Sequence, residues 1–296
     1  MWQLLLKKWL VGQAQQQMRA AAMQAATQAA GQAMPADADQ PPERPRDVCH
    51  VGVVFALGIE AGGLVDLLQG VVRTEGAGFS AREGGLRGRR VVVVESGVGR
   101  QAAEQATEAL IQGHQPRWII SAGFAGGLHE SLAQGDILLA DQLVDASGCQ
   151  LAVDFHLDRE AIAAQRHLHV GRLLTADRII ADAAEKSILG REHGALAVDM
   201  ETLAVAEACH REKTRFLSVR IISDAVGHTL PKDIDYLVKR KSTAGRIGAA
   251  AGAILRRPGS IKDMWQLKED ALVASERLAK FLAGIIEQLP KAPPGV

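Results

Sequence analysis

Aromatic residues and net charge are both scarce in this sequence. Phenylalanine, tryptophan and tyrosine together make up 4% of the 296 residues, and the formal net charge at pH 7 is +0. Proteins that bind nucleic acid usually present a basic surface, and those that bind single strands add aromatic rings on which bases stack. The composition therefore gives no reason to expect a nucleic-acid partner.

Cysteine is also sparse, and the histidines form no metal-binding pattern. Cys49, Cys149 and Cys209 are odd in number and far apart, so they provide no CxxC pair and no zinc spacing. His167 and His169 stand two residues apart without an acidic or cysteine partner in the surrounding pattern. We expect reduced thiols in a cytoplasmic protein, and no metal site.

The apolar stretch at the start of the chain is too short to span a bilayer. Lys7 and Lys8 interrupt it, and Trp2 and Trp9 lie on either side of that pair. An amphipathic segment of this kind can lie on a membrane surface, which suggests peripheral contact through residues 1–12. The other interpretations are a helix that packs on a partner subunit and a frayed arm.

Residues 1–46 also differ in composition from the rest of the chain. Glutamine and alanine dominate residues 13–33 and favour a helix, whereas residues 34–47 contain four prolines and are typical of a linker. Hydrophobic residues make up 47% of the whole chain, which is enough for a sizeable core. We expect a helical and linker extension over residues 1–46 and one globular domain over residues 47–296.

Strand-like and helical patterns alternate through the globular part. Residues 48–57 form a continuous apolar run typical of a buried strand, and residues 118–122 form another. A helical pattern covers residues 101–112 between them. Gly84-Gly85 separates two further strand-like runs and predicts a hairpin turn. This order of elements predicts the α/β class.

Acidic side chains stand at the ends of several strand-like segments. Asp199 and Glu201 flank Met200 where a short apolar run passes into a helical pattern, and Asp224 ends a later run. Open α/β sheets bind their ligands outside the carboxyl ends of the strands. Each acid could instead cap a helix. Together with Glu60, which follows the first strand, the acids predict one polar pocket.

Two glycine-rich segments follow strands. Gly97-x-Gly99-x-x-Ala102 opens a helix, where backbone amides can face an anion or a polar ligand. A dinucleotide site would need an acid at the end of the next strand, but residues 121–123 contain none, so that site is not expected. Residues 123–127, which begin with Gly123, predict a second tight turn where a flat base can approach the main chain.

These motifs together resemble the nucleoside phosphorylase and nucleosidase superfamily, and most of all the 5′-methylthioadenosine/S-adenosylhomocysteine nucleosidases. Each motif is weak alone, but their order across residues 48–226 is specific. The matching stretches are residues 51–60, 96–100, 121–128 with 135–137, 198–201 and 222–224.

The resemblance implies a single α/β domain whose mixed, partly barrel-like central sheet is flanked by helices. It implies cleavage of the N-glycosidic bond of a purine nucleoside by water, without a metal ion or an organic cofactor. The small-molecule partner would be a nucleoside of the 5′-methylthioadenosine/S-adenosylhomocysteine type. The assembly would be a homodimer in which partner residues close the site, with apolar surface remaining on the helices after Glu60 and Arg100.

The family's site residues can be carried over position by position. Glu60 matches the acid that activates the attacking water, and Asp224 matches the acid that protonates the departing base, with Ser223 orienting it. Glu201 matches the acid that binds the ribose hydroxyls. Met200 matches the residue that packs under the sugar. Ser96 and Arg220 match further residues of the pocket.

The family chemistry explains these residue types. The transition state resembles an oxocarbenium ion, so carboxylates near the sugar stabilise its positive charge. The base leaves more easily when it is protonated, so an acid beside it has to hold a proton near neutral pH. We expect burial to raise the pKa of Asp224 for this purpose.

Some positions depart from the family pattern and support alternatives. Ile179 stands where the family often has an aromatic that stacks on the base. The segment over residues 150–170 is shorter than the matching segment of the family. The tail over residues 231–289 resembles the hopanoid-associated phosphorylases, thought to act on an adenosyl-lipid. A phosphate-dependent phosphorylase is therefore the alternative, although residues 60–68 contain no cation for phosphate and Arg100 would have to serve. A nucleoside-binding protein without catalysis is a third interpretation.

Overall fold

The computed structural model describes residues 49–76, 79–153, 165–230 and 260–290. The predicted extension over residues 1–46, including its proposed membrane contact, lies outside these ranges. In the part of the chain that is described, no helix combines the length and the apolar character needed to cross a membrane.

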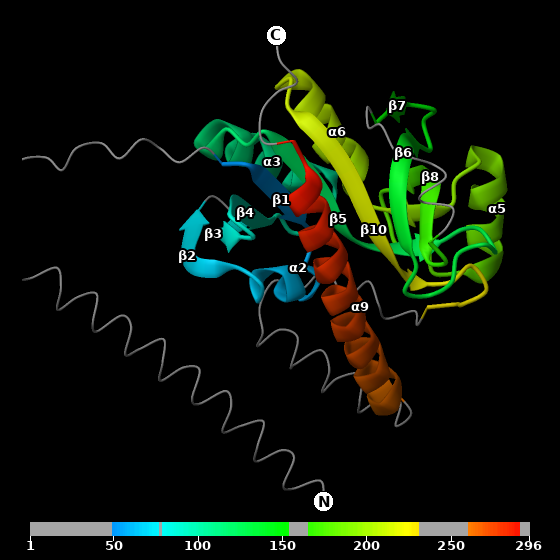
Figure 1. Ribbon diagram of the computed structural model, residues 1–296. Coiled ribbons are helices and arrows are strands. Elements are labelled where there is room, and N and C mark those ends of the chain that lie inside the picture. Colours follow the sequence, from blue (N-terminus) through cyan, green and yellow to red (C-terminus); the bar gives the residue numbers. More distant parts are fainter. Residues whose placement is uncertain (1–48, 77–78, 154–164, 231–259, 291–296) are drawn as a thin grey trace, which may run out of the picture. The chain divides into compact units, whose positions relative to one another are not determined.

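The described elements follow the alternation that the sequence predicts. In chain order they are β1 (Val51–Phe55), α2 (Gly58–Val65), β2 (Gln69–Gly76), β3 (Phe79–Leu86), β4 (Arg89–Glu95), α3 (Arg100–His114), β5 (Trp118–Gly127), β6 (Ile137–Asp145), β7 (Gln150–Ala152), β8 (Leu168–Thr175), α5 (Ala183–His193), β9 (Ala197–Asp199), α6 (Thr202–Arg211), β10 (Arg215–Asp224) and α9 (Ser260–Gln288). Figure 1 shows this order along the chain.

The strands form one mixed sheet, part of which closes into a ring. β5 pairs in parallel with β10, β10 pairs antiparallel with β6, and β6 and β8 are parallel. β8 then pairs in parallel with β9, and β9 returns antiparallel to β5. From β5 the sheet continues through β1, β4 and β3 to the edge strand β2. The prediction of a mixed, partly barrel-like sheet in an α/β domain is confirmed.

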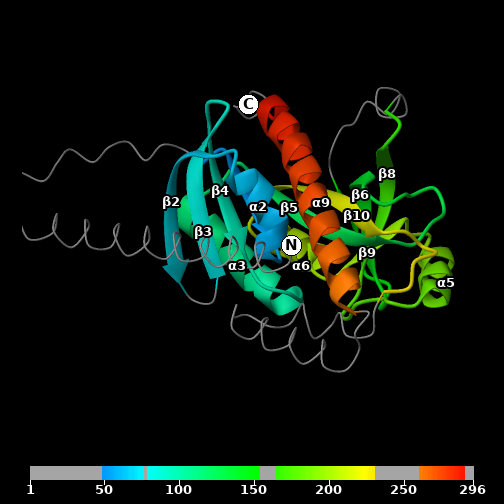
Figure 2. The same cartoon turned by 90° about the horizontal axis from the view of Figure 1, so that it is seen from below.

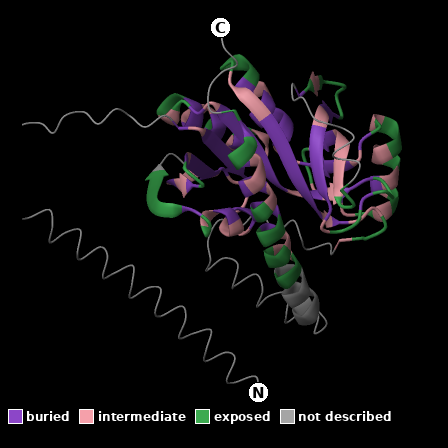
Figure 3. Cartoon of the chain, in the orientation of Figure 1, coloured by how far each residue is buried: buried purple, intermediate pink, exposed green. Residues whose placement is uncertain are grey.

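Helices cover both faces of the open part of the sheet (Figures 1 and 2). On one face Val53 clusters with Leu64 of α2 and Leu282 of α9. On the other face Val54 clusters with Leu110 of α3. Neighbouring residues of a strand point to opposite faces, so a strand covered on both sides must be apolar throughout. This is why β1 is buried along its whole length, as Figure 3 shows for the centre of the sheet.

The predicted hairpin is present, but its turn is not at Gly84-Gly85. β3 and β4 pair antiparallel, and both glycines lie inside β3. The turn is Arg87-Gly88, whose φ angles of 48° and 73° fit a two-residue hairpin turn with positive φ at both positions. A Cβ on Gly84 would lie 2.9 Å from the carbonyl oxygen of Gln69, so glycine there allows β2 to approach closely.

The predicted turn over residues 123–127 is also wrong, because β5 continues as a strand to Gly127. Glycine at these positions leaves space for side chains that pack against the strand. A Cβ on Gly123 would lie 2.8 Å from Oε1 of Glu60, and a Cβ on Gly126 would lie 3.4 Å from Oδ2 of Asp224. The glycines of β5 therefore make room for two carboxylates at the carboxyl end of the strand.

Candidate functional site

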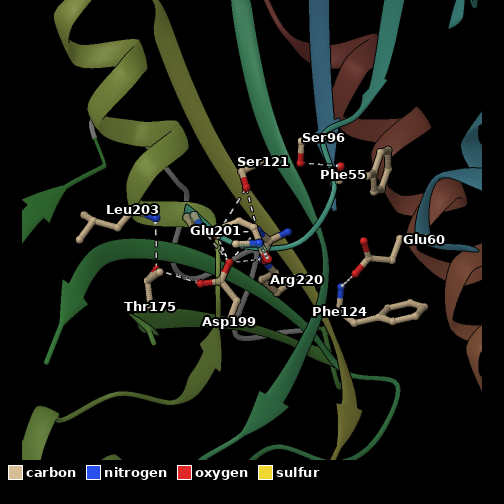
Figure 4. A network of polar contacts seen from close by, with 12 residues as sticks. Phe55, Glu60, Ser96, Ser121, Phe124, Thr175, Asp199, Glu201, Leu203 and Arg220 are labelled. Atoms are coloured by element: carbon tan, nitrogen blue, oxygen red, sulfur yellow. Dashed lines mark hydrogen bonds and ion pairs between the residues drawn. The ribbon is translucent and has the colours of Figure 1, made fainter. Parts of the chain in front are cut away.

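A small cavity lies at the carboxyl ends of the central strands. Its polar side chains are those of Glu60, Ser96, Ser121, Glu201 and Arg220. β10 supplies the arginine, and the acids come from the helix starts that follow β1 and β9. The structure thus brings together four of the predicted site residues, which are distant in sequence (Figure 4). Ser121 was not singled out by the sequence, since a serine inside a strand carries no distinctive pattern.

Glu60 lies in the first turn of α2, directly after β1, and its side chain is held by backbone amides. Oε2 accepts a hydrogen bond from Leu57 N at 2.8 Å, and Oε1 accepts one from Phe124 N at 2.9 Å. The residue is 5% exposed, and this burial raises the pKa of its carboxyl. The two amides and the charge of Arg220 oppose that rise in pKa without cancelling it.

Asp199 and Glu201 have different roles, although both stand at the start of α6. The Asp199 carboxylate accepts from Thr202 N at 2.9 Å and pairs with Arg220 at 2.8 Å, so it caps the helix. Glu201 makes no such cap bond, and its Oε1 accepts from Gly99 N at 2.8 Å. The helix-cap interpretation therefore applies to Asp199, while Glu201 faces the cavity from the start of α6 and accepts a hydrogen bond from the glycine-rich segment before α3.

The pKa of Glu201 is raised to about 8. Burial is the main cause, and the negative charge of Asp199 adds to it, whereas the Gly99 amide works in the opposite direction. Both causes disfavour the ionised form. Burial and the neighbouring charge thus favour the protonated form of Glu201, which can donate as well as accept hydrogen bonds.

The raised pKa of Glu201 predicts a pH-dependent stability. The folded protein holds this proton over the window from the ordinary value of 4.5 to about 8, so the free energy of unfolding falls as pH rises through that window. Glu201→Gln should flatten this fall, because glutamine does not titrate. Thermal unfolding measured across the window gives the slope. Glu192→Gln, on an exposed position of α5, is the control; an equal flattening there would contradict the assignment.

Both arginines near the site are already paired with carboxylates. Arg220 contacts Asp199, and its Nη2 donates to Ser121 Oγ at 2.7 Å. Arg100 lies 3.1 Å from Asp145 and 2.9 Å from Asp177. Arg100 also donates to the main-chain oxygen of Thr175, so it ties α3 to the ends of β6 and β8. Neither arginine brings an unneutralised positive charge to the cavity.

Asp224 ends β10 as predicted, but its surroundings differ from those that the sequence suggested. Its Oδ1 accepts a hydrogen bond from the Ser223 hydroxyl at 2.5 Å, and the same hydroxyl oxygen lies 3.2 Å from the main-chain oxygen of Ala125. Its Oδ2 forms an ion pair with the fully buried Lys186 of α5. The expectation for Asp224 rested on burial alone and missed this cation. A single lysine in a mostly polar helix gives no signal of burial.

The remaining predicted positions lie around these two groups. Gly123 is opposite Arg220 in the sheet, next to the Glu60 carboxylate. Met200 and Ile179 are half-buried, and neither is among the residues that line the cavity. The Asp224 group sits beside the same strand as the cavity, since Gly126 pairs with Asp224 two residues beyond the amide that binds Glu60.

The paired histidines do have an acidic partner, contrary to the sequence interpretation. His167 Nδ1 lies 2.8 Å from Asp136 Oδ1, and His169 Nε2 lies 3.0 Å from Asp136 Oδ2. Asp136 precedes β6 and is distant in sequence, so local spacing could not reveal it. Across the described residues there is no group of three or more histidine, cysteine and acidic side chains arranged to hold a metal ion.

Comparisons with known proteins agree with this geometry. Residues 50–257 match the family model of the phosphorylase superfamily. The 5′-methylthioadenosine/S-adenosylhomocysteine nucleosidase of Shewanella loihica is 29% identical over 212 residues, which are 64% of this chain and 92% of that protein. The enzyme of the same name from Shewanella sediminis is 31% identical over the same shares.

A solved structure shares the fold. It is the 5′-methylthioadenosine/S-adenosylhomocysteine nucleosidase of Neisseria meningitidis in complex with methylthio-immucillin-A. Its TM-score with this chain is 0.62 at 23% identity, and the match covers 82% of this chain and 100% of that one. At this level of identity the likeness concerns the arrangement of sheet and helices.

Proposed function

Because this chain belongs to the phosphorylase superfamily, we propose that it cleaves the N-glycosidic bond of a purine nucleoside by adding water. The observation that carries the proposal is the cavity at the carboxyl ends of β1, β5 and β10, which Glu60 and Glu201 both face. Carboxylates around a sugar stabilise the positive charge of an oxocarbenium-like transition state. Burial raises the pKa of Glu60, and a carboxylate whose pKa is raised is a stronger base.

Each site residue has a role in this reaction. Glu60 takes a proton from the attacking water, and its two backbone amides fix the carboxylate in place. Glu201 binds the ribose hydroxyls, for which a protonated carboxyl can donate and accept. Asp224 protonates the departing base. The remaining positions shape the pocket: Ser223 orients Asp224, Met200 packs under the sugar, Gly123 lets the main chain approach the ligand, and Ser96 and Arg220 complete the wall.

The charges of the site support water over phosphate as the acceptor. The cavity is lined by two acids and one arginine, and that arginine is paired with Asp199. The other candidate cation, Arg100, is neutralised by Asp145 and Asp177. A phosphate dianion would enter such a site without an available counter-charge. The phosphate-dependent alternative, including its adenosyl-lipid form, therefore has less support.

The similar nucleosidases suggest a substrate of the 5′-methylthioadenosine/S-adenosylhomocysteine type. The direct test is incubation of the protein with a panel of purine nucleosides, with and without phosphate, followed by identification of the sugar product. Free ribose or a 5′-substituted ribose formed at the same rate without phosphate is the expected result. A sugar 1-phosphate would overturn the choice of acceptor, and binding without any product would favour the non-catalytic interpretation.

We further expect a homodimer in the cytoplasm. Among the described residues, the large apolar side chains that remain exposed include Leu67, Val71 and Val72, which follow α2. None of the exposed large apolar side chains of the described residues lies on α3, so the apolar surface expected on that helix is absent, whereas the surface that follows α2 fits the expectation. Sedimentation at micromolar concentration should show a dimer. A monomer under those conditions would contradict this expectation.

Residues 1–46 should be dispensable for the chemistry, because every site residue lies beyond Cys49. A protein that begins at Asp47 should keep its turnover on a soluble nucleoside and should lose any binding to liposomes that contain anionic lipid. Turnover and co-sedimentation of the full chain and the shortened protein give the comparison. A folded but inactive shortened protein would place the extension in the site, and equal liposome binding would exclude the membrane role.

A further inference from the structure

The buried cation Lys186 has no part in the roles assigned so far. It is the one fully buried residue of α5, where the neighbouring positions are exposed or half-buried. A lysine is rarely buried completely unless its ammonium is paired, because loss of hydration strongly disfavours the charge. Its position beside Asp224 therefore needs an explanation beyond the packing of α5.

Oxygens of one short segment surround the ammonium group. Nζ contacts Asp224 Oδ2, donates to the main-chain oxygen of His228 at 2.7 Å, and lies 3.4 Å from that of Ala225. A second tie between the same parts of the chain is the hydrogen bond from Leu230 N to the oxygen of Ala181, at 2.9 Å. The start of α5 thus holds the end of β10 and the turn after it.

Both carboxylate oxygens of Asp224 have a partner within the protein. One carboxylate oxygen is engaged by the Ser223 hydroxyl and the other by Lys186. An acid that protonates a departing base must gain that proton from a neighbour. The ammonium group of Lys186 is the group in contact with Asp224 that can release one, since a lysine can give up its proton whereas an arginine cannot.

We propose, on the basis of the nucleosidase function, that Lys186 is a positioning residue that holds Asp224 beside the leaving base and supplies the proton that Asp224 passes on. As the C–N bond breaks, its electron pair goes to the base, and in the same step a proton passes from Lys186 to Asp224 and from Asp224 to a nitrogen of the departing base. The water oxygen bonds to the sugar carbon and loses a proton to Glu60. After product release, Glu60 gives a proton to solvent and Lys186 regains one.

Lys186→Arg separates this role from a purely structural one. Arginine keeps the positive charge but does not release its proton. We expect a folded variant whose turnover of the purine nucleoside falls about 10²-fold, the usual contribution of a positioned proton donor. Turnover of p-nitrophenyl riboside should fall far less, because nitrophenolate leaves without protonation. Arg191→Lys, an exchange of basic side chains at an exposed position of the same helix, is the matched control.

Two outcomes overturn the proposal: normal purine turnover in Lys186→Arg, and equal losses on both substrates. If the larger arginine prevents folding, Lys186→Met is compared on the same two substrates by the same criteria. The double variant with Asp224→Asn gives an independent measure, since a residue that acts only through Asp224 should add no further loss. Losses that multiply would contradict the relay. A wild-type protein that cleaves neither substrate would count against the nucleosidase function itself.

Discussion

Replacing Asp224 with asparagine should lower turnover of a purine nucleoside by about 10²–10⁴-fold, the usual contribution of a positioned acid. Asparagine keeps the shape of the side chain and an oxygen that faces Lys186, but it cannot pass a proton to the base. The loss should appear in kcat, because base protonation takes place in the transition state. Steady-state kinetics with the nucleoside found by the substrate panel give the measurement.

The same change should also lower stability, because it leaves a buried ammonium without its charged partner. Removal of one member of a buried ion pair costs about 3–5 kcal/mol in other proteins, and here the two carbonyl oxygens that contact Lys186 remain in place. Kinetics should therefore be measured well below the melting temperature. Asp66→Asn, at an exposed position after α2, is the matched control. Near-normal turnover in the folded Asp224→Asn protein would contradict both enzymatic assignments of this residue.

Glu60→Gln should slow turnover by a similar factor of about 10²–10⁴, because glutamine cannot take a proton from water. Glutamine still offers one oxygen to the surrounding amides, so the fold should persist. In the wild-type protein, burial raises the pKa of Glu60, so activity should rise with pH along a limb that lies above the ordinary value of 4.5. This limb should be missing from the residual activity of the variant. Glu130→Gln, on the surface, should change neither rate nor profile.

The response to phosphate makes the Glu60 experiment decisive between acceptors. With phosphate as the nucleophile no water needs a base, so Glu60→Gln would be less harmful than Asp224→Asn and omission of phosphate would stop the reaction. With water as the nucleophile both variants are severely impaired and phosphate has no effect. The two losses should not multiply in a double variant, because both groups act on one bond cleavage.

The sequence predicted those features that follow from local patterns. β1 was predictable because a strand covered on both faces is apolar throughout, and the end of β10 was predictable because an apolar pair gives way there to Ser223 and Asp224. The turns predicted at Gly84-Gly85 and at residues 123–127 were wrong for a tertiary reason. Gly84 and Gly123 are glycines because another chain segment or side chain comes close to them, and this does not interrupt the strand.

The rest of the site could not be predicted because it depends on contacts between segments that are distant in sequence. The sequence could not decide which of Asp199 and Glu201 caps α6, since both stand at the same strand-to-helix junction. In the structure Arg220 pairs with Asp199, which caps the helix, and Glu201 faces the cavity instead. The burial of Lys186 could not be predicted for the same reason, because it depends on how α5 packs against the end of β10.

The closed ring of five strands has a consequence for synthesis of the protein. β5 needs β10 as a neighbour, and the chain between them contributes the other three strands of the ring. Pairing between strands so far apart in sequence is slow, and during translation β5 would present an unpaired apolar edge until β10 leaves the ribosome. Chaperone dependence should therefore be greatest for nascent chains that stop between α6 and β10. Because Asp224 is the last residue of the closing strand, no shorter intermediate contains a complete site.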